Sequence, residues 1–170
     1  MGRFGDELGE TLSGYNGVIP TERINSMSMY PEVMCIPMRE ELTRLGVEEL
    51  KTADAVDEAL KESGTALVVV NSICGCAAGR MRPAVRMALQ NGAKPDRAYS
   101  VFAGQEKEAT DRARGYFTGY PPSSPSIALF RDGQLVYFMQ RRDIESREAP
   151  AIAAELKAAF DRFCGSNVAV

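Results

Sequence analysis

The sequence predicts an α/β fold in which helices cover both faces of a mixed β-sheet. A continuous apolar run at 66–70 has the length and composition of a strand buried on both faces. Helical and strand patterns alternate after it, and the chain closes with two short strands joined by a turn and then a helix. A strand–helix–strand unit makes parallel neighbours and a hairpin makes antiparallel ones, so the predicted sheet is mixed.

Length and composition fit one domain of ordinary globular type. The chain has 170 residues, of which 45% are hydrophobic and 25% charged. Residues 1–26 are polar and punctuated by glycine, and we expect a flexible leader or a loosely packed arm there. Residues 27–170 are expected to form a single domain with its own core.

Several function classes are excluded or disfavoured. The net charge of -3 gives no general attraction to nucleic acid or to an anionic membrane. No apolar run is long enough to span a membrane and no secretion signal is evident, so we expect a cytoplasmic protein. Histidine is absent, which removes Ser-His-Asp and Cys-His hydrolases and imidazole metal ligands. Four cysteines are too few for a secreted disulfide framework of this length.

Two helices are expected before the apolar strand. Apolar residues recur near helical spacing over 31–45, although Pro37 should bend this helix or end its first part. A second helix is expected over 53–62, with Thr52 as its N-cap. The first of these is an additional N-terminal helical segment.

The elements after the apolar strand follow in order. A helix is expected over 77–90 with a kink at Pro83, and Arg131-Asp132-Gly133-Gln134 is a hairpin turn. The remaining elements are a strand at 97–103, a helix at 106–116, strands at 127–130 and 135–138, and a last helix from Ile144 or Ala149 to Phe163. This is the order of elements in the thioredoxin fold.

Cys74-Gly75-Cys76 lies where the apolar strand gives way to a helix. A helix N-terminus carries partial positive charge and free N–H groups, and both favour a thiolate over a thiol. Gly75 gives the backbone the freedom that a very small disulfide ring requires. Such a disulfide should be strained, so the pair should oxidise or isomerise rather than act as a strong reductant. We expect Cys74 to be the nucleophile and Cys76 the resolving thiol.

Several segments resemble the bacilliredoxin family of small thioredoxin-fold proteins. The segments are Val69-Val70-Asn71-Ser72-Ile73-Cys74-Gly75-Cys76-Ala77-Ala78-Gly79, Val101 to Thr110, Tyr116-Phe117-Thr118-Gly119 and Pro122-Ser123-Ser124-Pro125-Ser126. The resemblance implies thiol-disulfide exchange, with removal of bacillithiol or another small thiol from mixed disulfides on proteins, and weak disulfide isomerase activity. It implies no bound cofactor. The oligomeric state is left open between a monomer and a weak homodimer.

The resemblance also assigns a substrate-binding loop. Ser124-Pro125-Ser126 is similar to the thioredoxin-fold loop in which a cis-proline faces the cysteines, and its backbone is expected to pair with an extended substrate. Ser124 and Ser126 are candidates to orient substrate, although serines are common in plain turns. Arg80 is a candidate to attract an anionic small thiol. Arg82 and Arg86 fit better as members of a solvated helix face.

Two alternatives remain open at the sequence level. Cys74 and Cys76 could bind a soft metal, with Cys164 or Cys35 completing the site. The chain could also be a redox-inert interaction module with unreactive thiols. Cys35 sits among apolar residues and is expected to be a packed hydrophobe, and Cys164 is a possible third redox partner near the end of the last helix.

Overall fold

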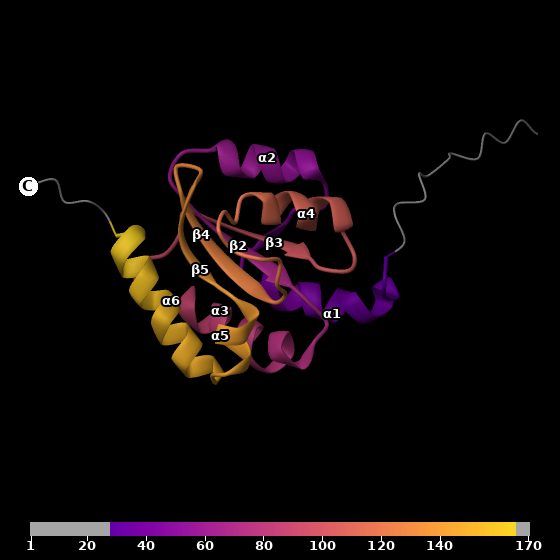
Figure 1. Ribbon diagram of the computed structural model, residues 1–170. Helices are drawn as coiled ribbons and strands as arrows, with labels where there is room; N and C mark the ends of the chain where they lie inside the picture. The colour runs from indigo at the N-terminus through magenta and orange to yellow at the C-terminus, as the bar shows by residue number, and fades with distance from the viewer. Residues whose placement is uncertain (1–27, 166–170) are drawn as a thin grey trace, which may run out of the picture.

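The computed structural model describes residues 28–165 and contains a five-stranded sheet in the order β1-β3-β2-β4-β5 (Figure 1). The first three of these strands are parallel to one another, and β4 and β5 are antiparallel to their neighbours. The mixed sheet predicted from the element order is therefore confirmed. The strands are β1 Glu48–Glu49, β2 Thr65–Asn71, β3 Arg97–Phe102, β4 Ser126–Arg131 and β5 Gln134–Met139. The leader predicted for residues 1–26 lies outside the described residues.

The central strand β2 is buried along its whole length because helices pack on both faces of the sheet. Side chains of a strand alternate between faces, so Leu67 and Val69 join one core while Val68 and Val70 join the other. This is why the run carries no polar residue between Thr65 and Asn71. The prediction of a doubly buried strand is confirmed.

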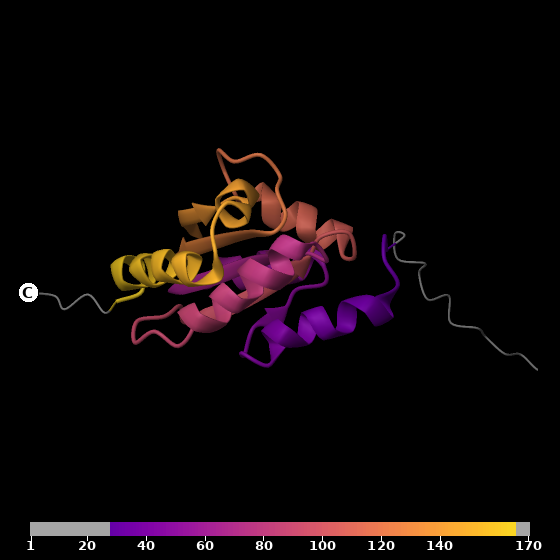
Figure 2. The ribbon, with the colours of Figure 1, turned by 90° about the horizontal axis from the view of Figure 1, so that it is seen from below.

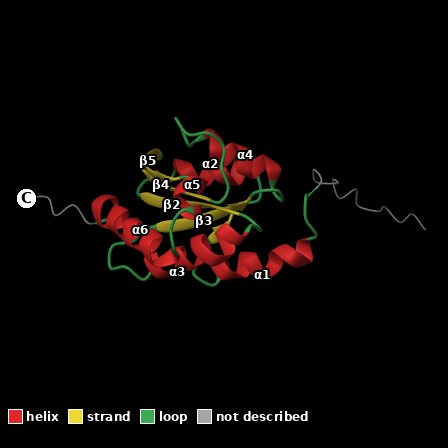
Figure 3. Cartoon of the chain, turned by 60° about the horizontal axis from the view of Figure 1, so that its bottom comes forward, coloured by secondary structure: helices red, strands yellow, loops and turns green. Residues whose placement is uncertain are grey.

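In the described part of the chain, five helical segments cover one face of the sheet and two cover the other (Figure 3). Seen from below, α6, α3 and α1 lie side by side across the first face (Figure 2). The first face carries α1 Glu32–Thr43, the π-helical η1 Ala77–Met81, α3 Arg82–Ala88, α5 Arg141–Glu145 and α6 Ala149–Phe163; the second carries α2 Ala53–Lys61 and α4 Lys107–Gly115. Within residues 28–165, no helix is both long and apolar enough to cross a membrane.

Two local predictions are confirmed in detail. The Thr52 side chain accepts a hydrogen bond from the N–H of Ala55 at 3.1 Å, which is the expected N-cap of α2. Asp132 and Gly133 have φ of 50° and 76°, and positive φ at both central residues is the geometry of a two-residue hairpin turn with the right twist.

The two prolines expected to disturb helices lie inside α1 and α3. Helix α1 continues through Pro37 and does not end there. The carbonyl that Pro37 leaves without a helical partner is that of Val33, a residue 74% exposed, so water can satisfy it. Pro83 occupies the first turn of α3, directly after the π-helical segment, where a missing N–H costs little. The helix type changes from π to α at Arg82, one residue before Pro83, and a kink at Pro83 stays a prediction.

Other boundaries differ from the pattern-based expectation because tertiary pairing decides them. Strand β1 was not predicted, since two glutamates have no strand preference; it exists because Glu48 and Glu49 pair with Tyr99 and Ser100. The last helical stretch is two helices, with a capping box between Gln140 and Asp143 starting α5.

Candidate thiol-disulfide exchange site

Cys74 and Cys76 lie at the junction between β2 and η1. The backbone carbonyl of Cys74 accepts hydrogen bonds from the N–H groups of Ala77 and Ala78, both at 3.1 Å, so helical hydrogen bonding begins at Cys74. Both thiols are free and partly exposed. The strand-to-helix position predicted for the pair is confirmed.

Gly75 is exposed, and a Cβ built on it would meet no atom within 4 Å. Its φ lies outside the left-handed region, so the backbone of the free-thiol form does not itself require glycine. Any need for glycine here must come from closing the small disulfide ring or from a partner approaching the thiols. That role stays a prediction.

Opposing effects act on the Cys74 thiol. Partial burial raises its pKa, but a hydrogen bond from the Ser72 side chain, the N–H groups of Ala77 and Cys76, and the charge of Arg141 together hold the pKa below the ordinary cysteine value. A lowered pKa increases the thiolate fraction near neutral pH, and the thiolate is the nucleophile. Of the two thiols, this environment marks Cys74 as the more reactive candidate.

A buried arginine holds the loop that precedes Cys74. Arg82 is 2% exposed, and its Nη1 donates to the side-chain oxygen of Asn71 at 3.1 Å and to the backbone carbonyl of Ser72 at 3.0 Å. The prediction that Arg82 lies on a solvated face is therefore wrong, because the irregular turn after β2 leaves polar groups that need a buried donor. Arg86 is exposed as expected.

The proline loop lies at the same end of the sheet. Ser126 pairs with Val70 near the end of β2, and the Ser124–Pro125 peptide bond that precedes it is cis, as the resemblance implied. Ser126 is 1% exposed and its hydroxyl donates to the carbonyl of Ser123, so it acts as a turn residue in this structure. Ser124 is partly exposed, and its carbonyl accepts from Arg141 at 3.2 Å.

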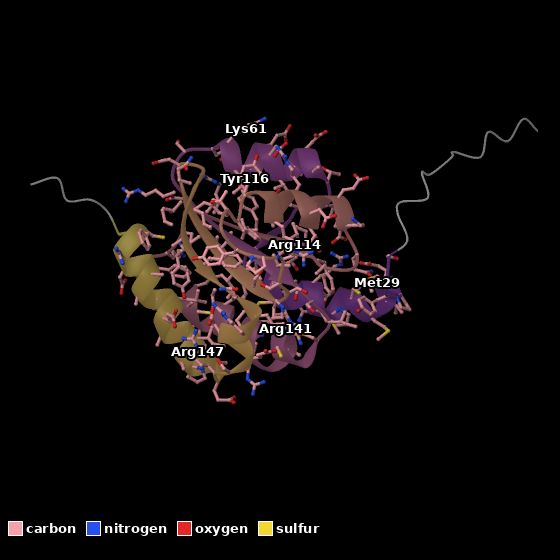
Figure 4. The ribbon with its side chains drawn as sticks, viewed as in Figure 1. Met29, Lys61, Arg114, Tyr116, Arg141 and Arg147 are labelled. Atoms are coloured by element: carbon pink, nitrogen blue, oxygen red, sulfur yellow. The ribbon has the colours of Figure 1, made fainter. Side chains whose placement is uncertain are left out.

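Arg141 is a cation whose charge acts on the Cys74 thiol, and no sequence motif predicts this role. It lies at the start of α5, on the opposite side of the molecule from Lys61 of α2 (Figure 4). Its pKa is raised by its hydrogen bond to Glu145 and by the charge of Cys74 and Cys76. The predicted candidate, Arg80, pairs instead with Glu148 at 3.2 Å. Residues far apart in sequence meet only through the hairpin, which is why spacing gave no signal for Arg141.

Comparison with known proteins finds relatives that match most of this chain. A family model described as disulphide isomerase matches residues 30–164. A bacilliredoxin of Koribacter versatilis is 64% identical over 140 residues, which cover 82% of this chain and 97% of that protein. The chain belongs to the bacilliredoxin family. A family member from Salinibacter ruber is 56% identical over 81% of this chain and 83% of its own, and one from Geobacillus kaustophilus is 49% identical over 80% and 95%.

Solved structures show the same fold at low identity. A protein described as having a thioredoxin fold matches with a TM-score of 0.52 at 18% identity, covering 65% of this chain and 93% of that one. Thioredoxin of Malassezia sympodialis matches with a TM-score of 0.50 at 16% identity, covering 69% and 90%. The predicted thioredoxin-like fold is confirmed, and membership of the bacilliredoxin family makes the protein a thiol-disulfide oxidoreductase.

The other two cysteines lie apart from the Cys-Gly-Cys pair of this bacilliredoxin-family chain. Cys35 is fully buried, as expected of a packed hydrophobe. Cys164 lies against Thr65 at the start of β2, and burial raises the pKa of its thiol. A seven-residue strand spans about 20 Å, so Cys164 does not complete a site with Cys74. Across residues 28–165, no three Cys, Asp or Glu side chains are grouped to hold a metal ion.

Proposed function

We propose that this protein removes a low-molecular-weight thiol, such as bacillithiol, from mixed disulfides on other proteins. The Cys74 thiolate attacks a sulfur of the mixed disulfide, the sulfur–sulfur bond breaks, and the leaving thiolate takes a proton. When the small thiol stays on Cys74, the protein partner leaves as a reduced thiol. Cys76 then displaces the small thiol and forms a Cys74–Cys76 disulfide, which a second thiol reductant must reduce.

The proposal is supported above all by the environment of Cys74. A partly exposed thiol with a lowered pKa at a helix start meets the two requirements of an attacking group, which are thiolate character and access. The Pro125 loop at the same end of the sheet offers backbone for an extended substrate segment. Gly75 is proposed to permit ring closure, and Ser124, Pro125, Ser126 and Arg80 to contribute to substrate binding. A cytoplasmic location belongs to the proposal, because thiols stay reduced there.

The pH dependence of alkylation tests the assignment of the nucleophile. Wild type, Cys74→Ser and Cys76→Ser are alkylated across a pH series and read by intact mass. We expect one thiol to react with a midpoint clearly below the ordinary value of about 8.5, and to be lost in Cys74→Ser but retained in Cys76→Ser. Reaction of both thiols only near the ordinary value would contradict the assignment.

The substrate class is tested by release of a small thiol from a model protein carrying one mixed disulfide. Parallel samples carry bacillithiol or glutathione, and intact mass follows the loss of each. Wild type should release bacillithiol, and Cys74→Ser should release none. Cys76→Ser should take the bacillithiol from the model protein and keep it as a mixed disulfide on Cys74. Equal rates for both thiols would support general exchange and count against a preference for bacillithiol.

A further inference from the structure

One buried hydrogen-bond network connects the core to the turn that carries the nucleophile. Asn71 ends β2 and is 1% exposed; its side-chain oxygen accepts from the N–H of Ser72 at 2.9 Å and from Arg82 at 3.1 Å. Its amide nitrogen donates to the carbonyl of Met38 in α1 at 3.1 Å. Arg82 donates in turn to Glu41 of α1 at 3.0 Å. The turn is therefore held from α3 and α1 at once.

Ser72 is the last member of this network and the one that reaches the nucleophile. Its N–H and its carbonyl are both committed to the buried network, to Asn71 and Arg82 respectively. With the backbone so held on both sides, its hydroxyl is directed toward Cys74, where it accepts the N–H of Cys74 at 3.2 Å. The same hydroxyl is the side-chain hydrogen-bond partner of the thiol. A small rotation of the Ser72 peptide would move this hydroxyl away.

The burial of the Arg82 guanidinium costs free energy unless its donors are satisfied, so the contacts that it makes in the interior must explain why it is buried. A surface arginine would serve equally well to pair with Glu41, which is 37% exposed. Only the contacts to Asn71 and Ser72 require burial. They are also the contacts that shape the turn before Cys74.

We propose that Arg82 is a positioning residue for thiol-disulfide exchange, which fixes Asn71 and the Ser72 carbonyl and thereby holds the Ser72 hydroxyl on Cys74. Arg82 acts through the turn and not through its charge: its three side-chain hydrogen bonds go to Glu41, Asn71 and Ser72. The charge beside the thiol comes from Arg141. The inference rests on the proposed role of Cys74 as nucleophile.

The test compares alkylation midpoints of Cys74 in four proteins, all in a Cys76→Ser background: otherwise unchanged, Arg82→Met, Ser72→Ala, and the pair combined. Loss of a hydrogen bond to a charged group should slow alkylation at fixed neutral pH about ten- to a hundredfold and move the midpoint upward. If Arg82 acts through Ser72, the combined variant should match Ser72→Ala, because the two changes remove one interaction. If Arg82→Met instead slows alkylation by the same factor whether residue 72 is Ser or Ala, Arg82 acts independently of Ser72, through its charge. That outcome would overturn the proposal.

Arg97→Met is the control, since Arg97 is a partly buried arginine, 25% exposed, that also donates to a backbone carbonyl beside β2, that of Ser63 at 2.8 Å, but at the end of the strand away from Cys74. It should lower stability and leave the Cys74 midpoint unchanged; an equal shift would indicate general loosening and overturn the inference. If Arg82→Met does not fold, Glu41→Ala takes its place in the test. We expect a smaller upward shift of the Cys74 alkylation midpoint, and an unchanged midpoint would contradict the proposal. The proposed function fails only if Cys74 of the otherwise unchanged protein has no lowered alkylation midpoint. The inference about Arg82 can fail while that midpoint stays low.

Discussion

The reactivity of Cys74 depends on a balance between burial and a few polar contacts. Burial alone raises the pKa of the thiol, and the hydroxyl of Ser72, two backbone N–H groups and Arg141 more than offset it. These contacts differ in kind. The hydroxyl and N–H groups act at hydrogen-bond range, whereas Arg141 acts through its charge from a side chain that is 47% exposed. Salt screens the charge of Arg141 and hardly affects the hydrogen bonds.

Arg141→Gln should therefore raise the pKa of Cys74, because it removes a positive charge that favours the thiolate. The midpoint of the alkylation profile should move upward at low salt, and the difference from wild type should shrink at 1 M salt. Arg141→Lys should retain most of the effect. Arg142→Gln is the control, since this neighbour is 76% exposed and its ion pair is with Asp143. A shift of the same size in Arg142→Gln would assign the effect to net charge and not to Arg141.

Single elements of the fold are held by local interactions that do not touch the site. Helix α2 packs against α4 on the face of the sheet away from the cysteines, and its first turn is capped by Thr52. The cap satisfies one backbone N–H that the helix itself leaves without a partner. It contributes to stability and lies on the opposite face of the sheet from the thiols.

Thr52→Ala should lower the free energy of unfolding by about 1 kcal/mol, the usual cost of losing an N-cap. Urea unfolding followed by circular dichroism measures this. Thr52→Ser keeps the acceptor oxygen and should cost much less. The alkylation profile of Cys74 should be the same in all three proteins, and a changed profile would mean that α2 is coupled to the site after all.

At the scale of the whole molecule, Arg39 joins α1 to the rest of the fold. It bonds Glu32 in α1, Glu49 in β1 and Glu106 before α4 at 2.8, 2.6 and 2.5 Å, and it lies over the ring of Phe102 at 4.8 Å. Burial lowers the pKa of Arg39, but the three carboxylates raise it, so the group stays charged. Segments up to 74 residues apart in sequence meet at one guanidinium.

Arg39→Met should lower the free energy of unfolding by about 3–5 kcal/mol, because it leaves the nearly buried carboxylate of Glu106 without its partner. The reference is Arg44→Met in the same region of the chain, whose ion pair with Glu40 is exposed and should contribute less than about 1 kcal/mol. Equal losses in thermal or urea unfolding for the two variants would show that the Arg39 cluster is not stabilising.

Prediction from sequence succeeded where one segment carries its own signal. The apolar run of β2, the Thr52 cap and the Asp132-Gly133 turn each follow from nearest neighbours, and each is confirmed. The Cys-Gly-Cys pair was placed correctly for the same reason, because a strand pattern ends and a helical pattern begins around it. The family resemblance then supplied the fold and the cis bond at Pro125.

Prediction failed where a residue's role depends on a partner distant in sequence. Arg82 has helical spacing from Arg86 and looked solvated, yet it is buried, because the turn after β2 needs a donor. Arg141 shows no motif at all and reaches the site only because β4 and β5 return the chain to it. Strand β1 exists only through its pairing with β3.

Sequence patterns alone were enough to locate two thiols one residue apart at a helix start, and to give the order of elements that builds the sheet. Local propensity and patterning act between near neighbours, so a single sequence suffices to read them. The polar groups around Cys74, in contrast, could be identified only after the chain was folded. Hydrogen bonds and charges act through space, and the fold alone brings Ser72, Arg82 and Arg141 to that end of the sheet.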